Sequence, residues 1–242
     1  MKKDLYDELR DTFTRIVKEH NLEAENVTIR AATLTPEEAI GNPEDRDYPL
    51  ITGRERLIQA EFRGSFGQAF TDRYGNFDGT LSDIVTMELN NNFRRAVFVA
   101  GLNAVMRSLK LIEKTVHCRD GEPRQCGSEL VKHIGEKYGR PRIAMIGLQP
   151  RMVEALAEKF ELKVTDMDKK NIGAEKFGVT IQSPDEAASN LEWCDIVLVT
   201  GTTVANGTVP QFVNDKPAIF YGTTVAGAAE LLGLDRWCFY GH

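Results

Sequence analysis

The second half of the chain repeats one pattern, in which a short continuous run of apolar residues is followed by a helical segment. This pattern restricts the fold more than any other feature. Residues 142–146 (RIAMI) and 195–199 (DIVLV) resemble strands that are buried on both faces of a parallel sheet. Further strands are predicted at 162–165, 179–181, 218–221 and 237–240, and helices at 150–160, from 183 onward and at 224–232. This alternation predicts βαβ units, and therefore a parallel sheet with helices on both faces.

The first half has an α+β pattern instead. Helices are predicted at 5–18, 80–87 and 91–112, strands at 26–32 and 56–62, and a surface loop at 38–52. Because the helix at 91–112 is apolar on more than one face, we expect it to be buried. The polar stretch 115–127 predicts a connector between two domains, 1–120 and 121–242. A helix at 128–138 is predicted near the start of the second domain.

Composition and charge restrict the function. The chain has 242 residues, of which 42% are hydrophobic and 27% charged, as in an ordinary globular protein. A net charge of −6 without a dense Lys/Arg stripe disfavours a nucleic-acid partner. The longest apolar run, 96–105, is too short to span a membrane, and the charged N-terminus lacks the core of a signal peptide. Four cysteines without a dense framework predict reduced thiols and a cytoplasmic location.

Loops follow the predicted strands of the second half at 147–150, 166–168, 200–203 and 222–224. The carboxyl ends of parallel strands meet at one edge of a sheet, so these loops should border one crevice. The first loop is no dinucleotide fingerprint: only Gly147 of the three glycines is present, and Pro150 removes one amide. Gly147 either contacts the ligand or permits a tight turn. Asp166 is a candidate for binding ribose or another polyhydroxyl group, whereas the nearby Asp168 is equally typical of a solvated turn.

The segment 200–208 (TGTTVANGT) carries the most groups that can bind a ligand. Its hydroxyl, carboxamide and exposed backbone amide groups can hold carboxylate, phosphate or carbonyl oxygens. The alternative is a turn at Asn206-Gly207. A second loop of this kind, Gly222-Thr223-Thr224, favours binding, although Thr224 can also be a helix cap. The sequence thus predicts a cleft, facing the N-terminal domain, that binds an anion. Its residues are Thr200, Gly201, Asn206, Thr208, Gly222 and Thr223.

Histidine and cysteine side chains cluster at His117, Cys118, Cys126 and His133. Thiolate and imidazole ligands suit thiophilic metals, so Cys118 and Cys126 are candidate metal ligands. The alternative is two structural thiols and two surface imidazoles. Seven residues separate the two cysteines, which is not the spacing of a zinc knuckle, and we expect no tightly bound structural zinc. Cys194 and Cys238 flank apolar strands and are expected in the core.

Several of these segments resemble the "putative heavy-metal chelation" family, a domain of unknown function. The segments are Thr200-Gly201 with Asn206-Gly207-Thr208, Leu102-Asn103-Ala104, Ile146-Gly147 with Pro150, and Gly222-Thr223-Thr224. The resemblance extends from about Leu57 to Gly241. It implies an N-terminal domain like the small α+β domain of enolase, joined to a Rossmann-like domain, with an active site in the cleft between them. The family name implies metal chelation.

The resemblance draws attention to Asn103, an amide within an otherwise apolar helix. A buried amide needs hydrogen bonds, so Asn103 either fixes the packing of the two domains or reaches the interdomain cleft. Residues 64–67 (GSFG) are likewise either a loop that approaches the ligand or a hairpin bend.

Three functions follow from these observations. The first is a small-molecule-binding protein, conceivably an enzyme, with an anionic or metal-complexed ligand between the domains. The second is a metal-binding or metal-delivery protein that uses Cys118, Cys126 and one or both of His117 and His133. The third is a non-catalytic ligand sensor or assembly module. Fold alone does not choose among them, and the reaction, the cofactor and formation of a homo-oligomer stay open.

Overall fold

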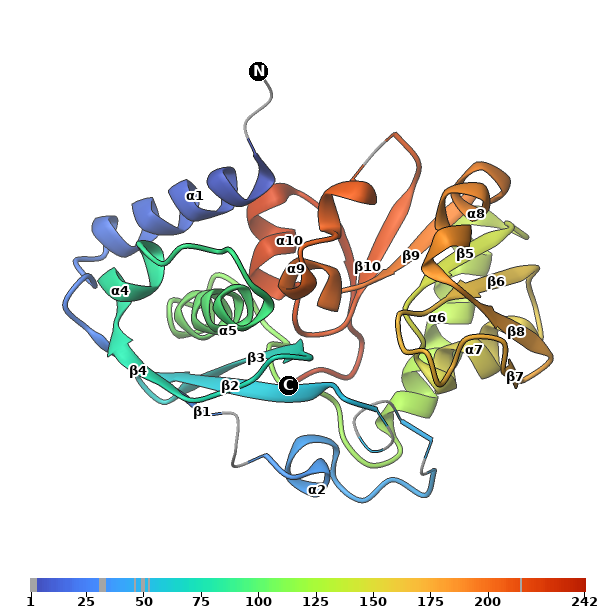
Figure 1. Cartoon of the computed structure of the whole chain (residues 1–242), viewed down its shortest axis with the longest axis horizontal. Coiled ribbons are helices and arrows are strands. Elements are labelled where there is room, and N and C mark those ends of the chain that lie inside the picture. Colours follow the sequence, from blue (N-terminus) through green and yellow to red (C-terminus); the bar gives the residue numbers. More distant parts are fainter. Residues whose placement is uncertain (1–3, 31–33, 46, 49–50, 52, 214) are drawn as a thin grey trace.

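The computed structural model describes residues 4–30, 34–45, 47–48, 51, 53–213 and 215–242. It contains one antiparallel and one mostly parallel sheet (Figure 1). Helix α5 (Asn92–Ser108) lies on the antiparallel sheet and contacts the helices of the other sheet. The mixed α/β architecture predicted from the sequence is therefore confirmed.

The antiparallel sheet has the strand order β3-β2-β1-β4. Its strands are β1 (Asn26–Arg30), β2 (Arg56–Phe62), β3 (Ser65–Thr71) and β4 (Phe77–Thr80). The predicted strand 26–32 is found over 26–30, and its last two residues lie outside the described part of the chain. Helices α1 (Leu5–Glu19), α2 (Pro36–Ile40) and α4 (Leu81–Val85) complete this half. Helix α2 overlaps the beginning of the predicted loop 38–52, and Thr35 caps this helix with a capping box.

The parallel sheet has the order β11-β10-β9-β5-β6-β8-β7, so the strand order reverses between β5 and β9. Its strands are β5 (Ile143–Ile146), β6 (Leu162–Thr165), β7 (Glu175–Lys176), β8 (Val179–Gln182), β9 (Ile196–Thr200), β10 (Ala218–Tyr221) and β11 (Asp235–Trp237). All pairs are parallel except the edge pair β7–β8. The last strand was predicted at 237–240 but ends at Trp237. The aromatic residues after it pack on one another, with the Phe239 ring centroid 5.7 Å from that of Trp237 and 4.9 Å from that of Tyr240.

Helices cover both faces of this sheet, as predicted. Helices α6 (Glu122–Tyr138) and α7 (Pro150–Ala157) share one core with one face. Helices α8 (Ala187–Trp193), α9 (Thr202–Asn206) and α10 (Ala226–Leu232) pack on the other. Two 3₁₀ turns, Pro184–Glu186 and Val209–Gln211, precede α8 and follow α9. Helix α6 begins at Glu122, within the predicted connector 115–127, because Pro123 fits the first turn of a helix.

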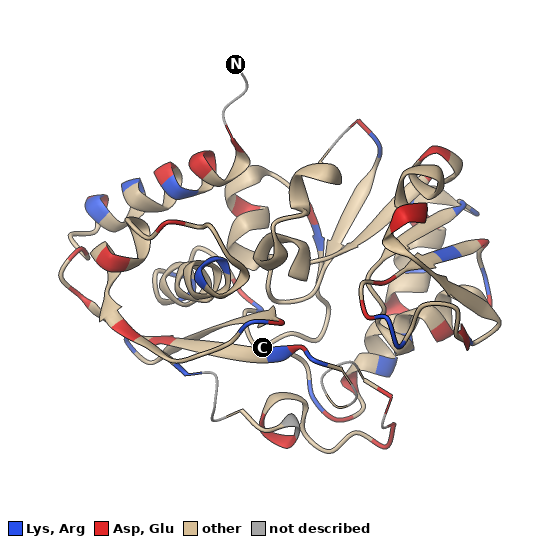
Figure 2. Ribbon diagram, viewed as in Figure 1, with Lys and Arg blue, Asp and Glu red and all other residues tan. Residues whose placement is uncertain are grey.

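Helix α5 joins the cores of the two halves. Every residue from Ala96 to Met106 is buried, on all sides of the helix, and none of them is charged. Charged residues of this half lie on outer elements such as α1 (Figure 2). One continuous apolar cluster contains α5, the antiparallel sheet and residues of β9 and β10. Helix α1 of the first half also contacts the second half, because the Tyr6 hydroxyl donates to the Val204 carbonyl oxygen at 2.7 Å. Within the described residues, no helix is both long and apolar enough to cross a membrane.

Gly67 lets strand β3 approach α5 closely. A Cβ atom at this position would lie 2.2 Å from the Ala104 nitrogen and 2.4 Å from the Ala100 carbonyl oxygen. Neither interpretation of residues 64–67 was therefore complete. Gly64 forms the turn between β2 and β3 with a positive φ of 74°, whereas Gly67 belongs to a strand and faces a helix.

The side chain of Asn103 connects α5 to both sheets. Its Nδ2 group lies 3.1 Å from the Gln68 carbonyl oxygen in β3 and 3.3 and 3.1 Å from those of Thr223 and Thr224 after β10. Its Oδ1 accepts from the Gly227 amide at 2.8 Å. In the opposite orientation of the carboxamide, Oδ1 would lie against carbonyl oxygens and Nδ2 against an amide N–H group, so only the orientation described allows these hydrogen bonds. Asn103 is completely buried and uses its hydrogen-bonding capacity within the chain, as in the packing alternative.

We predict that Asn103→Ala lowers the free energy of unfolding by at least about 2 kcal/mol, because each buried polar group left unpaired costs about 1–3 kcal/mol. Urea denaturation measures the change. Asn90→Ala, at an exposed position, is the control and should change stability by less than about 0.5 kcal/mol. Equal stability of the two variants would contradict this role of Asn103.

Candidate functional site

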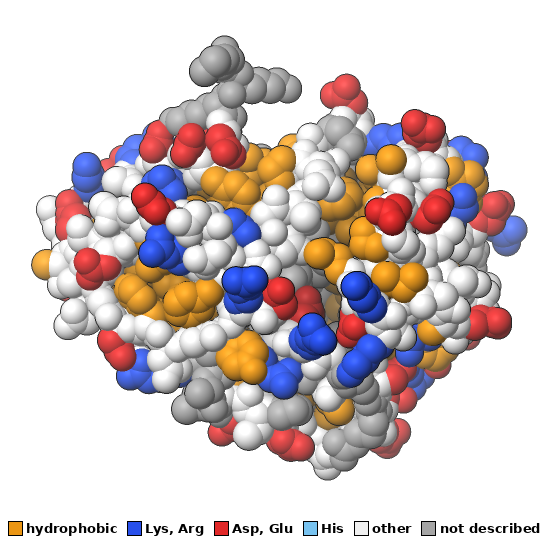
Figure 3. Space-filling view, in the orientation of Figure 1, with side chains coloured by type: hydrophobic (Ala, Val, Ile, Leu, Met, Phe, Trp, Pro, Cys, Tyr) orange, Lys and Arg blue, Asp and Glu red, His pale blue; other side chains and the backbone are white. Residues whose placement is uncertain are grey.

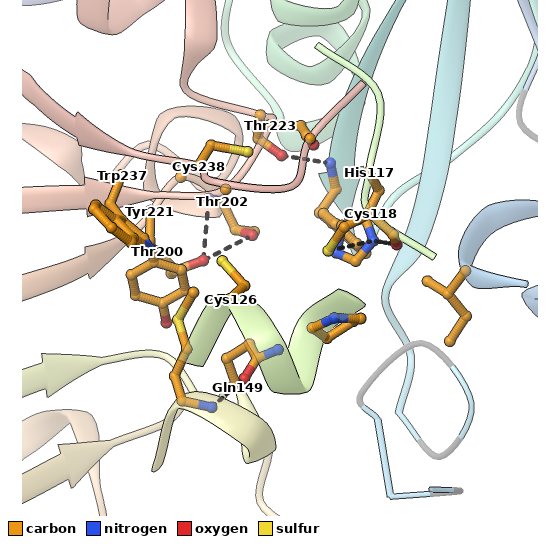
Figure 4. A pocket seen from close by; sticks show the side chains of 18 of the residues that line it. His117, Cys118, Cys126, Gln149, Thr200, Thr202, Tyr221, Thr223, Trp237 and Cys238 are labelled. Carbon is orange, nitrogen blue, oxygen red and sulfur yellow. Dashed lines mark hydrogen bonds between the residues drawn. The ribbon is translucent and has the colours of Figure 1, made fainter. Parts of the chain in front are cut away.

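A partly enclosed cavity of about 110 Å³ lies between the two halves. Residues of the first half, including Ile40, Tyr48 and Phe70, form one wall, and loops of the parallel sheet form the other. Figure 3 shows the molecule hollowed between the two halves, and Figure 4 shows the side chains around the cavity. The cavity is the place where the antiparallel sheet faces the strand-end loops, as the sequence predicted for the ligand cleft.

Loops at the reversal of strand order supply one wall. Leu148 and Gln149 follow β5, Thr200 to Thr202 end β9 and begin α9, and Gly222 to Thr224 follow β10. The Gln149 side chain caps α7 by accepting from the Met152 amide at 2.6 Å. The hydroxyl of Thr200 lies 3.3 Å from that of Thr202. Parallel sheets bind ligands at such a reversal, outside the carboxyl ends of the strands.

Two polar atoms in the wall have no hydrogen-bond partner among the described residues. These are the hydroxyl oxygen of Thr223 and the indole Nε1 of Trp237. Both are buried, and Thr223 as a whole is 2% exposed. The neighbouring Thr224 differs, because its hydroxyl accepts from the Phe70 amide at 3.0 Å and so connects the two walls. Buried polar groups in native proteins nearly always have a partner, so these two atoms indicate a ligand or ordered water.

Three thiols from separate segments line the same cavity: Cys118 in the loop before α6, Cys126 in α6, and Cys238 after β11. Burial raises the pKa of the Cys118 thiol well above its usual value, and that of Cys238 as well, so both are protonated at neutral pH. The expectation that Cys238 lies in the core was wrong, since it is only partly buried and faces the cavity. Cys194 is 2% exposed, as expected for a core residue.

His117 lies beside these thiols with a defined ring orientation. Its Nδ1 is 2.6 Å from the Cys118 carbonyl oxygen, which can only accept, so Nδ1 donates. Burial lowers the pKa of His117 and favours the neutral ring, leaving a lone pair on Nε2. His133 lies elsewhere, with its ring centroid 4.8 Å from that of Trp237, and does not line the cavity. Among the described residues, no three His, Cys, Asp or Glu side chains are placed to hold one metal ion.

Glu55, directly before β2, is the carboxyl group of the cavity wall. Burial, and after it the nearby carboxylates of Asp166, Asp72 and Asp168, together raise its pKa to about 7. Lys and Arg do not occur among the described residues that line the cavity.

The predicted ligand-binding residues divide into two groups. Thr200, Gly201, Gly222 and Thr223 line the cavity, together with the candidate metal ligands Cys118 and Cys126. The residues Asn103, Gly147, Asp166, Asn206 and Thr208 do not.

Each residue of the second group has a structural contact. Gly147 has a φ of 88°, and a Cβ there would lie 2.7 Å from Thr200 Cγ2. The carboxylate of Asp166 accepts from the amides of Leu148 and Asp168, both at 2.8 Å, and so holds the loop after β5. Asn206 Oδ1 accepts from the amide and the hydroxyl of Thr208 at 3.0 and 2.6 Å, which is the turn alternative.

Sequence reasoning missed Glu55, Trp237 and Cys238. Glu55 precedes a correctly predicted strand but carries no motif. Trp237 was assigned to a strand as an apolar residue. Cys238 lies far along the chain from the other two cavity thiols, so no local spacing connects them.

We predict that stability depends on pH through Glu55. Its pKa in the folded protein is about 7, above the ordinary value, so the stability it contributes is complete at acidic pH and is lost as pH rises through about 7. The free energy of unfolding of Glu55→Gln minus that of the native protein should therefore be larger at pH 8 than at pH 5, by more than about 1 kcal/mol. Urea denaturation at both pH values measures this, with Glu61→Gln, an exposed carboxyl in β2, as control. A difference between native and Glu55→Gln protein that is independent of pH would refute the assignment.

Comparison with known proteins adds family and fold. Residues 129–232, from within α6 to the end of α10, match the model of a family described as "putative heavy-metal chelation". A solved protein of unknown function from that family, from Pyrococcus horikoshii, is similar with a TM-score of 0.57 at 18% identity, covering 91% of this chain and 79% of that one. Another, from Desulfitobacterium hafniense, has a TM-score of 0.50 at 11% identity, covering 73% and 72%. No curated protein matches. The resemblance indicated by the sequence motifs is thus confirmed: over residues 129–232 this chain matches the heavy-metal chelation family, and its fold is similar to that of the family's solved structures.

Proposed function

We propose that this protein binds a small molecule in the cavity between its two sheets. One observation carries the proposal: two residues that line the cavity, Thr223 and Trp237, each have a buried polar atom, the hydroxyl and the indole Nε1, without a partner among the described residues. Leaving such groups unpaired costs about 1–3 kcal/mol each. A ligand that supplies a hydrogen-bond acceptor to both would remove that cost.

The position of the cavity supports this function. The order β8-β6-β5-β9-β10-β11 is that of Rossmann-like sheets, and the loops after β5 and β9 flank the reversal. The wall combines apolar side chains, such as Leu148 and Met152, with a few polar groups, as is typical of small-molecule sites. The anion suggested by the threonine-rich loops has less support, because no cationic side chain of the described residues lines the cavity.

We predict opposite effects of Thr223→Val on stability and on binding. Valine has the shape of threonine without the hydroxyl, so it removes the buried hydroxyl that has no partner and should raise the free energy of unfolding of the ligand-free protein. Each kcal/mol gained should raise the melting temperature by about 2–4 °C. Losing the hydrogen bond should reduce occupancy by a co-purifying small molecule about 2- to 10-fold in native mass spectra.

Thr208→Val is the matched control. Its hydroxyl donates to Asn206 at 2.6 Å outside the cavity, so this variant should melt at a lower temperature and keep its occupancy. The proposal fails if Thr223→Val also melts at a lower temperature than the native protein and its occupancy by the co-purifying molecule equals that of the native protein. It fails likewise if no co-purifying molecule is found in any variant.

A thiophilic metal ion or metal complex is the second candidate. The observation that favours it is that Cys118, Cys126 and Cys238 line one cavity together with His117. The Nδ1 of this histidine donates a hydrogen bond to a carbonyl oxygen, so its Nε2 carries the lone pair that can bind a metal. Soft thiolate ligands suit such metals, and a carbonyl bond to the second ring nitrogen is usual for ligating histidines. Because no set of three described ligands is preformed, the thiols would have to close around the ion. All four cysteines are free, which supports a reducing, cytoplasmic location.

We predict that Cd²⁺ binds with a thiolate-to-metal charge-transfer band in the ultraviolet and with release of protons, because the Cys118 and Cys238 thiols are protonated in its absence. Replacing Cys118, Cys126 and Cys238 by serine should abolish the band, whereas Cys194→Ser should keep it. A band that survives the triple replacement would assign the metal to other ligands.

A further inference from the structure

Glu55 lines the cavity, yet its carboxylate receives no hydrogen bond and forms no ion pair with any residue in the described part of the chain. Asp166, the charged group that acts most strongly on Glu55, differs. Its two oxygens accept from Leu148, Asp168 and Asn171, so it is held within its own loop. Glu55 is therefore the carboxylate with free acceptor capacity toward the cavity.

The charges around Glu55 are of one sign. The charged groups that act on it most are the carboxylates of Asp166, Asp72 and Asp168. The Tyr221 hydroxyl also faces this region, but it donates to the Gly147 carbonyl oxygen at 2.8 Å and stays neutral, since burial raises its pKa far above the ordinary value. The cavity therefore offers a site of negative potential to a ligand and no positive partner for an anion.

The remaining wall is mostly apolar or aromatic. Phe70, Leu148 and Met152 lie on it with the indole of Trp237, whose Nε1 has no partner, and the buried, unpartnered hydroxyl of Thr223 belongs to the same wall. A ligand with a cationic end, an apolar body and a hydrogen-bond acceptor for Trp237 Nε1 fits this distribution better than a polyanion does.

We propose that the ligand is an organic cation whose N–H groups pair with the carboxylate of Glu55 while its apolar body packs against the aromatic wall. This inference rests on the proposed function of the cavity, and it specifies the class of ligand. Charge-assisted hydrogen bonds from an amidinium, guanidinium or protonated amine would neutralise Glu55 in a site that has no lysine or arginine among its described residues. It replaces the anion that the threonine-rich loops suggested.

Three probes of nearly equal size and shape test the charge preference. Benzamidinium, benzamide and benzoate share a phenyl ring and differ in having a cationic, neutral or anionic head. Isothermal titration at pH 8 should show benzamidinium binding at least about 10-fold tighter than benzamide, with benzoate weakest, since a hydrogen bond between charged groups contributes about 1.5–3 kcal/mol. Glu55→Gln should bring benzamidinium to the affinity of benzamide, while Glu61→Gln should leave all three affinities unchanged.

The affinity for benzamidinium should also follow pH. Burial and the neighbouring carboxylates put the pKa of Glu55 at about 7, so a proton must leave before the cation binds. The dissociation constant should rise about tenfold per pH unit below pH 7 and level off above it. Other titratable side chains also line the cavity, namely those of His117, Cys118, Cys126 and Cys238, so variants are needed to assign the pH dependence. The slope below pH 7 should disappear in Glu55→Gln and persist in Glu61→Gln.

The outcomes separate the two proposals. Benzoate or benzamide binding as tightly as benzamidinium, with an affinity that Thr223→Val lowers, would overturn the cation preference and leave the cavity as a ligand site. A benzamidinium preference that survives in Glu55→Gln would likewise overturn the role of Glu55. Absence of binding by all three probes would overturn the inference, while occupancy by a co-purified molecule would still decide the proposed function independently.

Discussion

The carboxamide of Asn103 holds strand β3 and the loop after β10 to the same point on α5. These two segments supply facing walls of the cavity, through Phe70 on one side and Thr223 and Thr224 on the other. The position of the walls is therefore fixed by hydrogen bonds behind the cavity, within the core. The Phe70–Thr224 hydrogen bond adds a direct contact between the two walls.

Behind this junction the buried carboxamide of Asn103 has hydrogen-bond partners, whereas two buried polar atoms of the cavity wall have none among the described residues. These two atoms, a carboxyl group with a raised pKa and three thiols, of which Cys126 is buried and the other two are partly buried, all reduce stability or leave it unimproved. The continuous apolar cluster around α5 compensates for them. Buried polar atoms without a partner also occur at Arg10, Asp47, Arg151 and Asn190, but at the cavity they lie together with the carboxyl group and the thiols. Destabilising groups gathered in this way are typical of a site maintained for function.

Local sequence patterns predicted much of the fold, because the strands of the second half are buried on both faces and so appear as apolar runs. The parallel-sheet rule then correctly placed Thr200 beside Thr223, although they lie on different strands. The same rule could not exclude Asn206 and Thr208, since only the first residues of this segment, Thr200 to Thr202, line the cavity. Glu55 and Cys238 depend on the packing of the two halves, which no local pattern encodes. The short edge strand β11 was misplaced because aromatic residues that stack on one another resemble a strand.

The burial of α5 on every side has a consequence for how the chain is made. Strands β2 and β3 are synthesised before or with this helix, but α9 and α10, which cover its remaining surface, come from the last part of the sequence. Until they emerge, an uncharged helical surface stays exposed to water, and intermediates of this kind are prone to aggregate. The first half therefore depends on the second to complete its core, and the chain should acquire its native stability in one late, cooperative step.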